Sequence, residues 1–167
     1  MNLTKPGEIL DKVTELVMET FQKSGEDVKD GMDISMISFD FSEKNSEKKS
    51  LQFSGANNPL WLVRENELIE IKGDKQPIGF HENRKPFTTY KVELKQGDSI
   101  YLFTDGYADQ FGGPKGKKFK YKQLSEKLIS IGHLPMEKQK NEIETIFQYW
   151  KADLEQVDDV CVIGIRF

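Results

Sequence analysis

Acidic residues stand beside several predicted strands of this chain, and their placement is the feature best suited to chemistry. Asp105 comes two residues after the aromatic-rich run 100–103, whereas Asp158 and Asp159 come just before the apolar run that ends the sequence. If these two runs form neighbouring antiparallel strands, the end of the first lies beside the start of the second. Asp105 and Asp158 would then be close enough to bind one ion. Asp30, which precedes another predicted strand, could reach the same edge of the sheet.

Clusters made only of carboxylate oxygens are typical sites for Mg²⁺ or Mn²⁺, which take such ligands and keep several waters. Two of these ions about 3.5–4 Å apart can activate a water molecule for in-line attack on phosphorus. The acids also have a simpler interpretation, because acidic residues are common in turns. A hairpin turn at Asp105 and Gly106 with a solvated carboxylate would account for the same sequence. The spacing alone leaves both interpretations open.

The composition is that of an ordinary globular protein. With 167 residues, of which 37% are hydrophobic, the chain is long enough for one domain with a sizeable core. Its net charge of −4 argues against nucleic acid or an anionic membrane as the main partner. No apolar run reaches the length of a membrane span, and the N-terminus lacks the apolar core of a signal peptide. We therefore expect a cytoplasmic protein that neither inserts into a membrane nor binds nucleic acid.

The chain offers few alternatives to oxygen ligands. Its single cysteine, Cys161, excludes an internal disulfide and a cysteine zinc site. Because Cys161 lies within an apolar run, we expect it to be buried and unreactive. The chain contains two histidines, His81 and His133, which argues against a histidine-rich metal site or a Ser-His-Asp triad.

The hydrophobic pattern predicts an α+β protein. Helical spacing of apolar residues indicates helices over residues 6–22, 122–131 and 135–150. Apolar or alternating runs indicate strands over residues 34–41, 51–54, 60–64, 68–71, 87–94, 100–103 and 160–167. Because short turns separate them, the strands between residues 34 and 71 are expected to form one antiparallel meander. The run 34–41 is apolar on both faces, which is typical of a central strand.

The stretch after Asp105 is glycine-rich and locally basic. Three glycines between residues 112 and 116 indicate a mobile loop. Lys115, Lys117 and Lys118 could steer a phosphorylated substrate toward the acidic residues. The alternative is a solvated flap whose charges bind nothing.

Five short motifs follow one another from Asp30 to the end of the chain. They are DGMD from residue 30, GANNPL from 55, PIG from 77, GDSIYLFTDG from 97 and DDV from 158. In this combination and order, the sequence resembles the metal-dependent protein phosphatase family (PPM, type 2C), in its bacterial SpoIIE/RsbU-like branch. The resemblance covers most of the chain. Its most specific pieces are Thr-Asp-Gly at 104–106 and the acidic pair at 158–159.

The resemblance implies a fold and a site. The expected fold is an antiparallel β-sandwich flanked by helices (αββα), formed as a single domain over residues 1–167. By their positions in the motifs, Asp105 and Asp158 match ligands of a binuclear Mn²⁺ or Mg²⁺ centre. Asp30 matches the ligand of a more weakly held third ion. The residues expected beside these ligands are Asp109, Asp159 and Gly106.

One motif of the family is missing from this sequence. An Asp-x-x-Gly-His-Gly turn should precede the first helix and bridge the two metals, and nothing in residues 1–29 matches it. We therefore expect an N-terminally truncated, C-terminal portion of the domain. With Asp105 and Asp158 alone, two carboxylates would have to neutralise two divalent ions, so we expect weak binding of one ion at most and little activity. The missing strands would also open a sheet edge, which a homodimer could cover.

Two functional hypotheses follow from the resemblance. The first is a serine/threonine protein phosphatase domain, incomplete as given, that hydrolyses phosphoserine or phosphothreonine with a metal-activated water and no phosphoenzyme. Its substrate would be a phosphorylated protein, in this branch often a small anti-anti-sigma-type regulator. The second is a catalytically inactive pseudophosphatase that acts as a protein-interaction or signalling module. Hydrolysis of an aryl phosphate that needs Mn²⁺ and is lost in Asp105→Asn separates the two.

Overall fold

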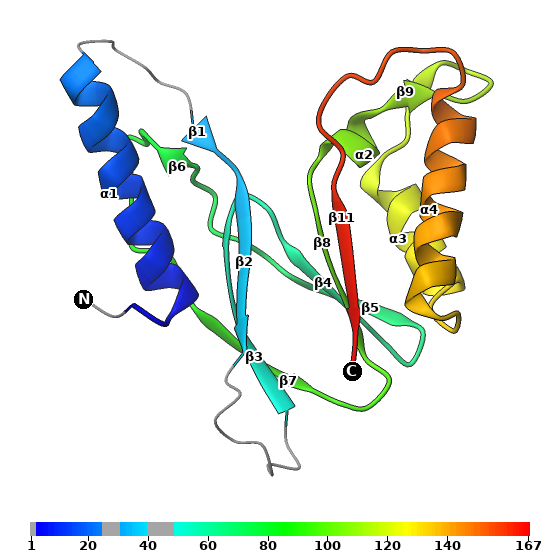
Figure 1. Cartoon of the computed structure of the whole chain (residues 1–167), viewed down its shortest axis with the longest axis horizontal. Helices are drawn as coiled ribbons and strands as arrows, with labels where there is room; N and C mark the ends of the chain where they lie inside the picture. Colours follow the sequence, from blue (N-terminus) through cyan, green and yellow to red (C-terminus); the bar gives the residue numbers. More distant parts are fainter. Residues whose placement is uncertain (1–2, 25–30, 40–48) are drawn as a thin grey trace. The chain divides into compact units, whose positions relative to one another are not determined.

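The computed structural model describes residues 3–24, 31–39 and 49–167, which divide into two compact units (Figure 1). The first unit comprises Met1–Leu60 and Ile71–Lys95, and the second comprises Trp61–Glu70 and Gln96–Phe167. Each unit has a sheet and at least one helix of its own.

A long helix and a three-stranded antiparallel sheet form most of the first unit. α1 (Pro6–Ser24) begins at a proline and carries Glu8 in its first turn, both of which favour a helix start. The sheet has the order β2-β3-β7, with strands β2 (Ile34–Phe39), β3 (Lys49–Ala56) and β7 (Tyr90–Leu94). Next to it, β1 (Gly31–Met32) pairs with β6 (Ile78–Gly79).

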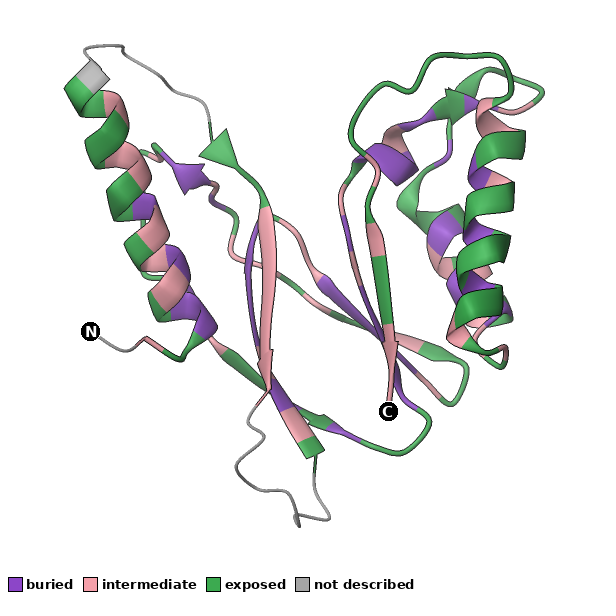
Figure 2. Cartoon of the chain, in the orientation of Figure 1, coloured by how far each residue is buried: buried purple, intermediate pink, exposed green. Residues whose placement is uncertain are grey.

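The core of the first unit lies where α1 packs on β3 and β6. Its buried hydrophobic residues are Leu10, Ala56, Ile78 and Phe87. The buried stripe of α1 is narrow (Figure 2), because Leu16, expected in the core from its helical spacing, is 51% exposed. Only part of the predicted apolar face is therefore covered within this unit.

The second unit is built on a four-stranded sheet with the order β11-β8-β4-β5. Its strands are β4 (Leu60–Arg64), β5 (Glu67–Ile71), β8 (Ser99–Phe103) and β11 (Val162–Arg166). β8 pairs antiparallel with both of its neighbours. β4 and β5 are joined by Glu65 and Asn66, whose φ angles of 50° and 63° are those of a tight type I′ hairpin turn.

Three helices and a hairpin accompany this sheet. They are α2 (Gly106–Asp109), α3 (Tyr121–Ser130), α4 (Met136–Lys151), and the pair β9 (Phe111–Gly112) and β10 (Lys117–Lys118). The core they enclose is aromatic: the Tyr107 ring lies 5.2 Å from that of Phe119 and 5.0 Å from that of Phe147. The Tyr107 hydroxyl donates a buried hydrogen bond of 2.8 Å to the Ile143 carbonyl. This core therefore fixes α2 against α4.

The α+β prediction is confirmed, and so are the three predicted helices, whose bounds differ by at most two residues from those observed. The predicted meander is wrong. β3 and β4 belong to different sheets, because the chain leaves the first sheet after Ala56. Asn57 has a φ angle of 58°, and its backbone amide donates a hydrogen bond to the Asp74 carbonyl instead of continuing the pairing of β3.

Two further expectations about strands need correction. Among the described strands, β2 lies at the edge of its sheet and not in the centre, and all six of its residues are half-buried. The final strand is also an edge strand, with Ile163 49% exposed, and Cys161 just before it is exposed rather than buried. Both errors have one cause: apolar composition shows that a strand is compatible with burial, but not how many neighbours cover it.

None of the helices found in the described residues combines the length and the apolar character needed to span a membrane.

Candidate metal centre

The carboxyl end of β8 lies beside the amino end of β11. The strands pair antiparallel from Ser99–Arg166 up to Phe103–Val162. The pairing continues one residue further, where the Thr104 amide donates to the Cys161 carbonyl at 3.0 Å. Asp105 therefore leaves one strand at the edge where Asp158 and Asp159 enter the other.

Thr104 closes this edge with its side chain. Its hydroxyl donates a hydrogen bond of 2.7 Å to the Asp159 carbonyl and accepts one of 2.9 Å from the Cys161 amide. Because one hydroxyl serves both groups, the backbone of residues 159–161 is held in register with the end of β8. Thr104 belongs to one of the sequence motifs, but no local pattern predicted this bridging role.

Gly106 lets the two acidic segments touch. A Cβ atom at this position would overlap the Asp159 carbonyl oxygen and would crowd the backbone of Asp158. Only glycine therefore allows this separation, and Gly106 is buried. The contact places the Asp105–Gly106 backbone directly against the Asp158–Asp159 backbone.

The carboxylates of Asp105, Asp158 and Asp159 all belong to exposed residues. Asp105 occupies the N-cap position of α2, but its side chain makes no capping hydrogen bond there. The Asp159 amide donates to Asp158 Oδ1 at 2.7 Å, which restrains that carboxylate. Within residues 3–24, 31–39 and 49–167, no three acidic, histidine or cysteine side chains form a ready ligand cluster.

These residues fit a single hard cation held by few protein ligands. Exposed carboxylate oxygens at a fixed strand edge are suitable ligands for Mg²⁺ or Mn²⁺, whose remaining positions waters can fill. A compact cage for two ions would need more carboxylates than the described residues bring together. Asp30, the third predicted ligand, lies outside the described residues.

Asp109 lies at the other end of α2 and faces a lysine. Its carboxylate pairs with Lys118 Nζ at 2.8 Å, and both side chains are about two-fifths exposed, 41% and 44%. This pair ties α2 to β10. Asp109 is thus only four residues from Asp105 in the sequence, but its carboxylate pairs with Lys118 of the hairpin.

Gln110 links the end of α2 to the loop that precedes Asp158, and sequence reasoning missed this residue. It is fully buried, and its amide nitrogen donates to the carbonyls of Glu155 (2.9 Å) and Phe111 (3.0 Å). Its amide oxygen accepts from the Val157 amide at 3.3 Å. The loop that carries Asp158 is therefore fastened to the end of α2. A glutamine in a polar stretch gives no sequence signal for such burial.

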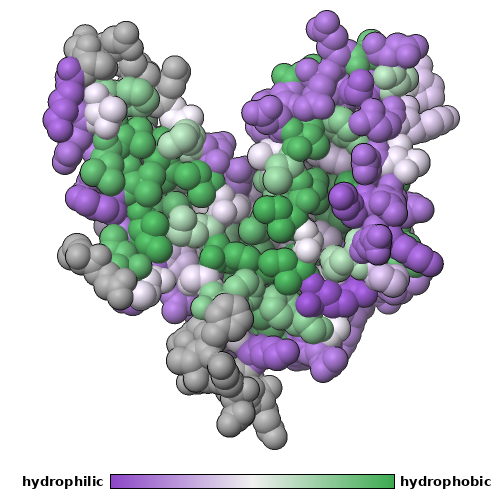
Figure 3. Space-filling model, viewed as in Figure 1, coloured by the Kyte–Doolittle hydropathy of each residue, from purple (hydrophilic) through white to green (hydrophobic). Residues whose placement is uncertain are grey.

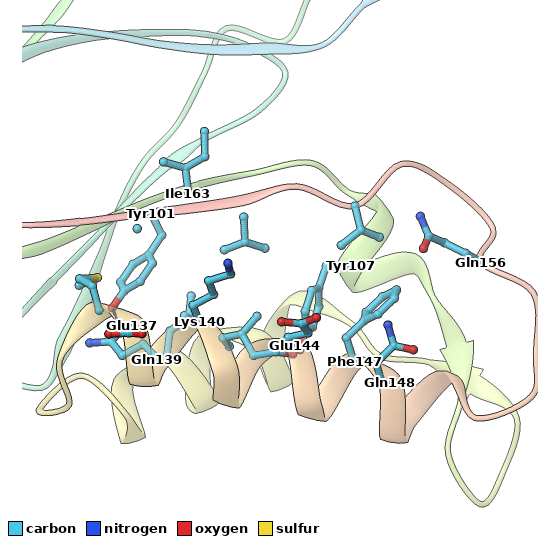
Figure 4. A pocket seen from close by; sticks show the side chains of 16 residues that line it. Tyr101, Tyr107, Glu137, Gln139, Lys140, Glu144, Phe147, Gln148, Gln156 and Ile163 are labelled. Carbon is cyan, nitrogen blue, oxygen red and sulfur yellow. Dashed lines mark hydrogen bonds between the residues drawn. The ribbon is translucent and has the colours of Figure 1, made fainter.

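A separate cavity of about 790 Å³ lies between α4 and β11, and none of the three exposed aspartates lines it. In Figure 4, Lys140 and Glu144 project from α4, and Tyr101 and Tyr107 approach from the sheet side. Tyr101 donates to Gln139 Oε1 at 2.6 Å across one end. Burial raises the pKa of both tyrosine hydroxyls above the ordinary value of about 10.

Several solved structures have a similar fold. The SiaA-PP2C domain of Pseudomonas aeruginosa matches with a TM-score of 0.83 and 23% identity, over 98% of this chain and 61% of that one. The phosphatase domain of SpoIIE from Bacillus subtilis matches with a TM-score of 0.59 and 14% identity, over 99% and 75%. The catalytic domain of the serine/threonine phosphatase PstP, solved with two manganese ions, gives 0.59 and 14%, over 90% and 65%.

These likenesses define the class of fold, which is that of PP2C phosphatases. The family model of stage II sporulation protein E (SpoIIE) matches residues 1–167. The chain therefore belongs to the SpoIIE family, as the motifs predicted. It spans 61% of the length of the SiaA chain that it matches. A comparison with curated proteins finds no match.

Proposed function

We propose that this domain hydrolyses phosphoserine or phosphothreonine in proteins, with Asp105 and Asp158 as ligands of a Mn²⁺ or Mg²⁺ ion. The observation that carries the proposal is the contact between Gly106 and the backbone of Asp158 and Asp159. It brings together acids that are more than 50 positions apart in the sequence. Membership of the SpoIIE family and the PP2C fold supports the reaction class.

The roles of the residues follow from their positions. Asp105 and Asp158 would hold the ion, and Thr104, Gly106 and Asp159 hold the two backbones that present them. A bound divalent ion would supply charge stabilisation at the phosphoryl group and an activated nucleophile. Because few carboxylates converge here, we expect weak binding of one ion. The role of Asp30 as ligand of a further ion remains part of this proposal.

The test is hydrolysis of p-nitrophenyl phosphate during titration with Mn²⁺, with ion binding followed by calorimetry. Asp105→Asn and Asp158→Asn should each lower Mn²⁺-dependent turnover by more than the roughly 10–100-fold that loss of a ligand's supporting residue costs. Asp153→Asn is the matched control, because Asp153 is an exposed aspartate after α4. Unchanged Mn²⁺ affinity in Asp105→Asn would contradict the site. No turnover with or without Mn²⁺ would favour the pseudophosphatase hypothesis.

The partner that we propose is a phosphorylated protein, such as a small anti-anti-sigma-type regulator. A cytoplasmic location agrees with such a substrate. We also propose a homodimer formed through β11, whose partner among the described strands is β8 alone. Gly164 is the central residue of this five-residue strand, so two copies can pair antiparallel about it. α4 presents Glu137, Lys140 and Glu144 beside the strand, which allows opposite charges of two copies to meet.

The dimer is tested by light scattering over a concentration series. Ile163→Lys places a charge on the exposed side of β11 and should shift the protein toward monomer. Leu154→Lys is the control, because Leu154 has the same 49% exposure and lies outside the strand. A monomer at every concentration would rule out this interface.

A further inference from the structure

The hairpin after α2 is firmly anchored, although its sequence indicated a mobile loop. The Gly113 amide donates to the Trp150 carbonyl at 2.9 Å, and Trp150 Nε1 donates to the Gln110 carbonyl at 3.0 Å. A Cβ at Gly112 would overlap the Trp150 carbonyl oxygen. The close fit joins β9 to the last turn of α4. The backbone that carries the lysines of the hairpin is therefore held in place.

These lysines surround a hollow of about 320 Å³. Its charged lining is formed by Lys115, Lys117, Lys118 and Lys120, and Trp150 forms part of its wall. All four lysines are exposed, and Figure 3 shows a largely hydrophilic surface around β9. The hollow is thus an accessible basic patch on a protein whose net charge is −4.

The positive charge of the hollow is only partly balanced. Lys118 pairs with Asp109, whereas no carboxylate in the described part of the chain forms an ion pair with Lys115, Lys117 or Lys120. Like charges gathered in one hollow repel one another, and an anionic ligand would relieve that repulsion. The backbone of Lys120 has a φ angle of 73°, which residues other than glycine rarely adopt. Its backbone amide donates a 2.7 Å hydrogen bond to the Ala108 carbonyl.

The hollow is linked to the acidic edge through α2. The Lys118–Asp109 ion pair and the Lys120–Ala108 hydrogen bond hold the chain segment of residues 118–120 against α2. Asp105 is the N-cap residue of that four-residue helix. A helical rise of 1.5 Å per residue separates Asp105 from Asp109 by roughly 6 Å along the axis. An extended peptide could therefore contact the hollow while presenting a residue a few positions away to Asp105.

We propose that this hollow binds acidic residues that flank the phosphorylated residue of a protein substrate. The inference rests on the proposed phosphatase function and adds a substrate class to it. Lysines are compact charges on flexible stems that suit varied carboxylates, whereas paired recognition of a second phosphate typically uses arginine, and the hollow contains none. Trp150 adds an apolar surface for the peptide between its charges.

The first test measures binding without catalysis. An unphosphorylated, fluorescein-labelled peptide rich in Asp and Glu is titrated with the protein in low salt. Lys115→Ala/Lys117→Ala/Lys120→Ala should weaken binding about tenfold, because each exposed pair contributes modestly. Lys72→Ala/Lys75→Ala/Lys91→Ala removes the same charge from exposed positions of the first unit and should leave binding unchanged. Equal weakening by both variants, or tighter binding of oligo-dT than of the peptide, would overturn the proposal.

The second test measures specificity during turnover. Two phosphoserine peptides are compared, one with acidic flanks and one with alanine flanks. The unmodified protein should have a higher kcat/KM for the acidic peptide than for the alanine peptide. The triple lysine-to-alanine variant of the hollow should lose about tenfold of this preference, through a higher KM for the acidic peptide. An undiminished preference would overturn the proposal. If the protein turns over neither peptide, the proposed function fails. The binding test then still decides whether the hollow binds acidic peptides.

Discussion

The hydroxyl of Thr104 lies 2.7 Å from the carbonyl oxygen of Asp159 and donates a hydrogen bond to it. The same hydroxyl accepts from the Cys161 amide at 2.9 Å. One side chain at the end of β8 thus sets the path of the chain as it enters β11. The position of the acidic pair depends on this short contact and on the absence of a side chain at Gly106.

Replacing Thr104 with valine keeps the shape and removes both hydrogen bonds. We expect a loss of about 1 kcal/mol in the free energy of unfolding, because water can replace the lost partner of the Cys161 amide at this exposed position. Mn²⁺ binding should weaken as well. Thr20→Val is the control, since the Thr20 hydroxyl donates only within α1, to the Leu16 carbonyl. Urea unfolding measures both variants, and equal losses would show that Thr104 has no special role.

Gly106→Ala should disturb the site directly, because its Cβ would overlap the Asp159 carbonyl oxygen. We expect a loss of about 3 kcal/mol together with weaker Mn²⁺ binding, as the two segments are forced apart. Gly116→Ala serves as control: it has φ 57° but nothing within 4 Å of the added atom. Its cost should be about 1 kcal/mol, from the backbone conformation alone. Calorimetric Mn²⁺ titration distinguishes the two, and unaltered binding in Gly106→Ala would contradict the contact.

Arg64 and Asp98 form the best-buried ion pair described in the second unit. Arg64 Nε and Nη2 donate to the two Asp98 oxygens, at 2.9 and 2.6 Å, and the Asp98 side chain is only 2% exposed. Asp98→Ala leaves a partly buried cation, so we expect a loss of about 3–5 kcal/mol in unfolding free energy.

Glu142→Gln breaks the more exposed pair with Lys127 and should cost less than about 1 kcal/mol. Chemical denaturation measures both changes. Comparable losses in the two variants would mean that burial does not decide the strength of the Arg64–Asp98 pair.

Alkaline pH should destabilise the protein through Tyr107. Burial raises the pKa of its hydroxyl above the ordinary value of about 10, so the folded state retains a proton that the unfolded state releases. The stabilisation is complete below the unfolded pKa. It declines above pH ~10 by about 1.4 kcal/mol per pH unit until the folded pKa is reached.

Tyr107→Phe removes this decline and costs about 1 kcal/mol at neutral pH, because the bond to the Ile143 carbonyl is lost. Tyr149→Phe is the control, since Tyr149 is 86% exposed. Urea midpoints between pH 8 and roughly pH 11 measure the difference. Parallel pH curves for Tyr107→Phe and Tyr149→Phe would refute the assignment.

Local patterns were sufficient for the helices and for most strands. Helical spacing depends on residues three and four positions apart, and in α3 the apolar residues at this spacing, Leu124 and Leu128, are fully buried. The same approach was less accurate for α1, where Leu16 follows the spacing but remains exposed. Strand partners lie far apart in the sequence, so the assignment of β3 and β4 to one sheet was wrong.

Sequence by itself determined the types and order of the elements and placed Asp105 and Asp158 next to strand ends. Tertiary structure decided which ends meet, because hydrogen bonds between β8 and β11 join residues about 60 positions apart. It also decided the roles of Thr104, Gly106 and Gln110. Their effect depends on a carbonyl or amide from a distant segment, and no local pattern specifies which distant segment a side chain will contact.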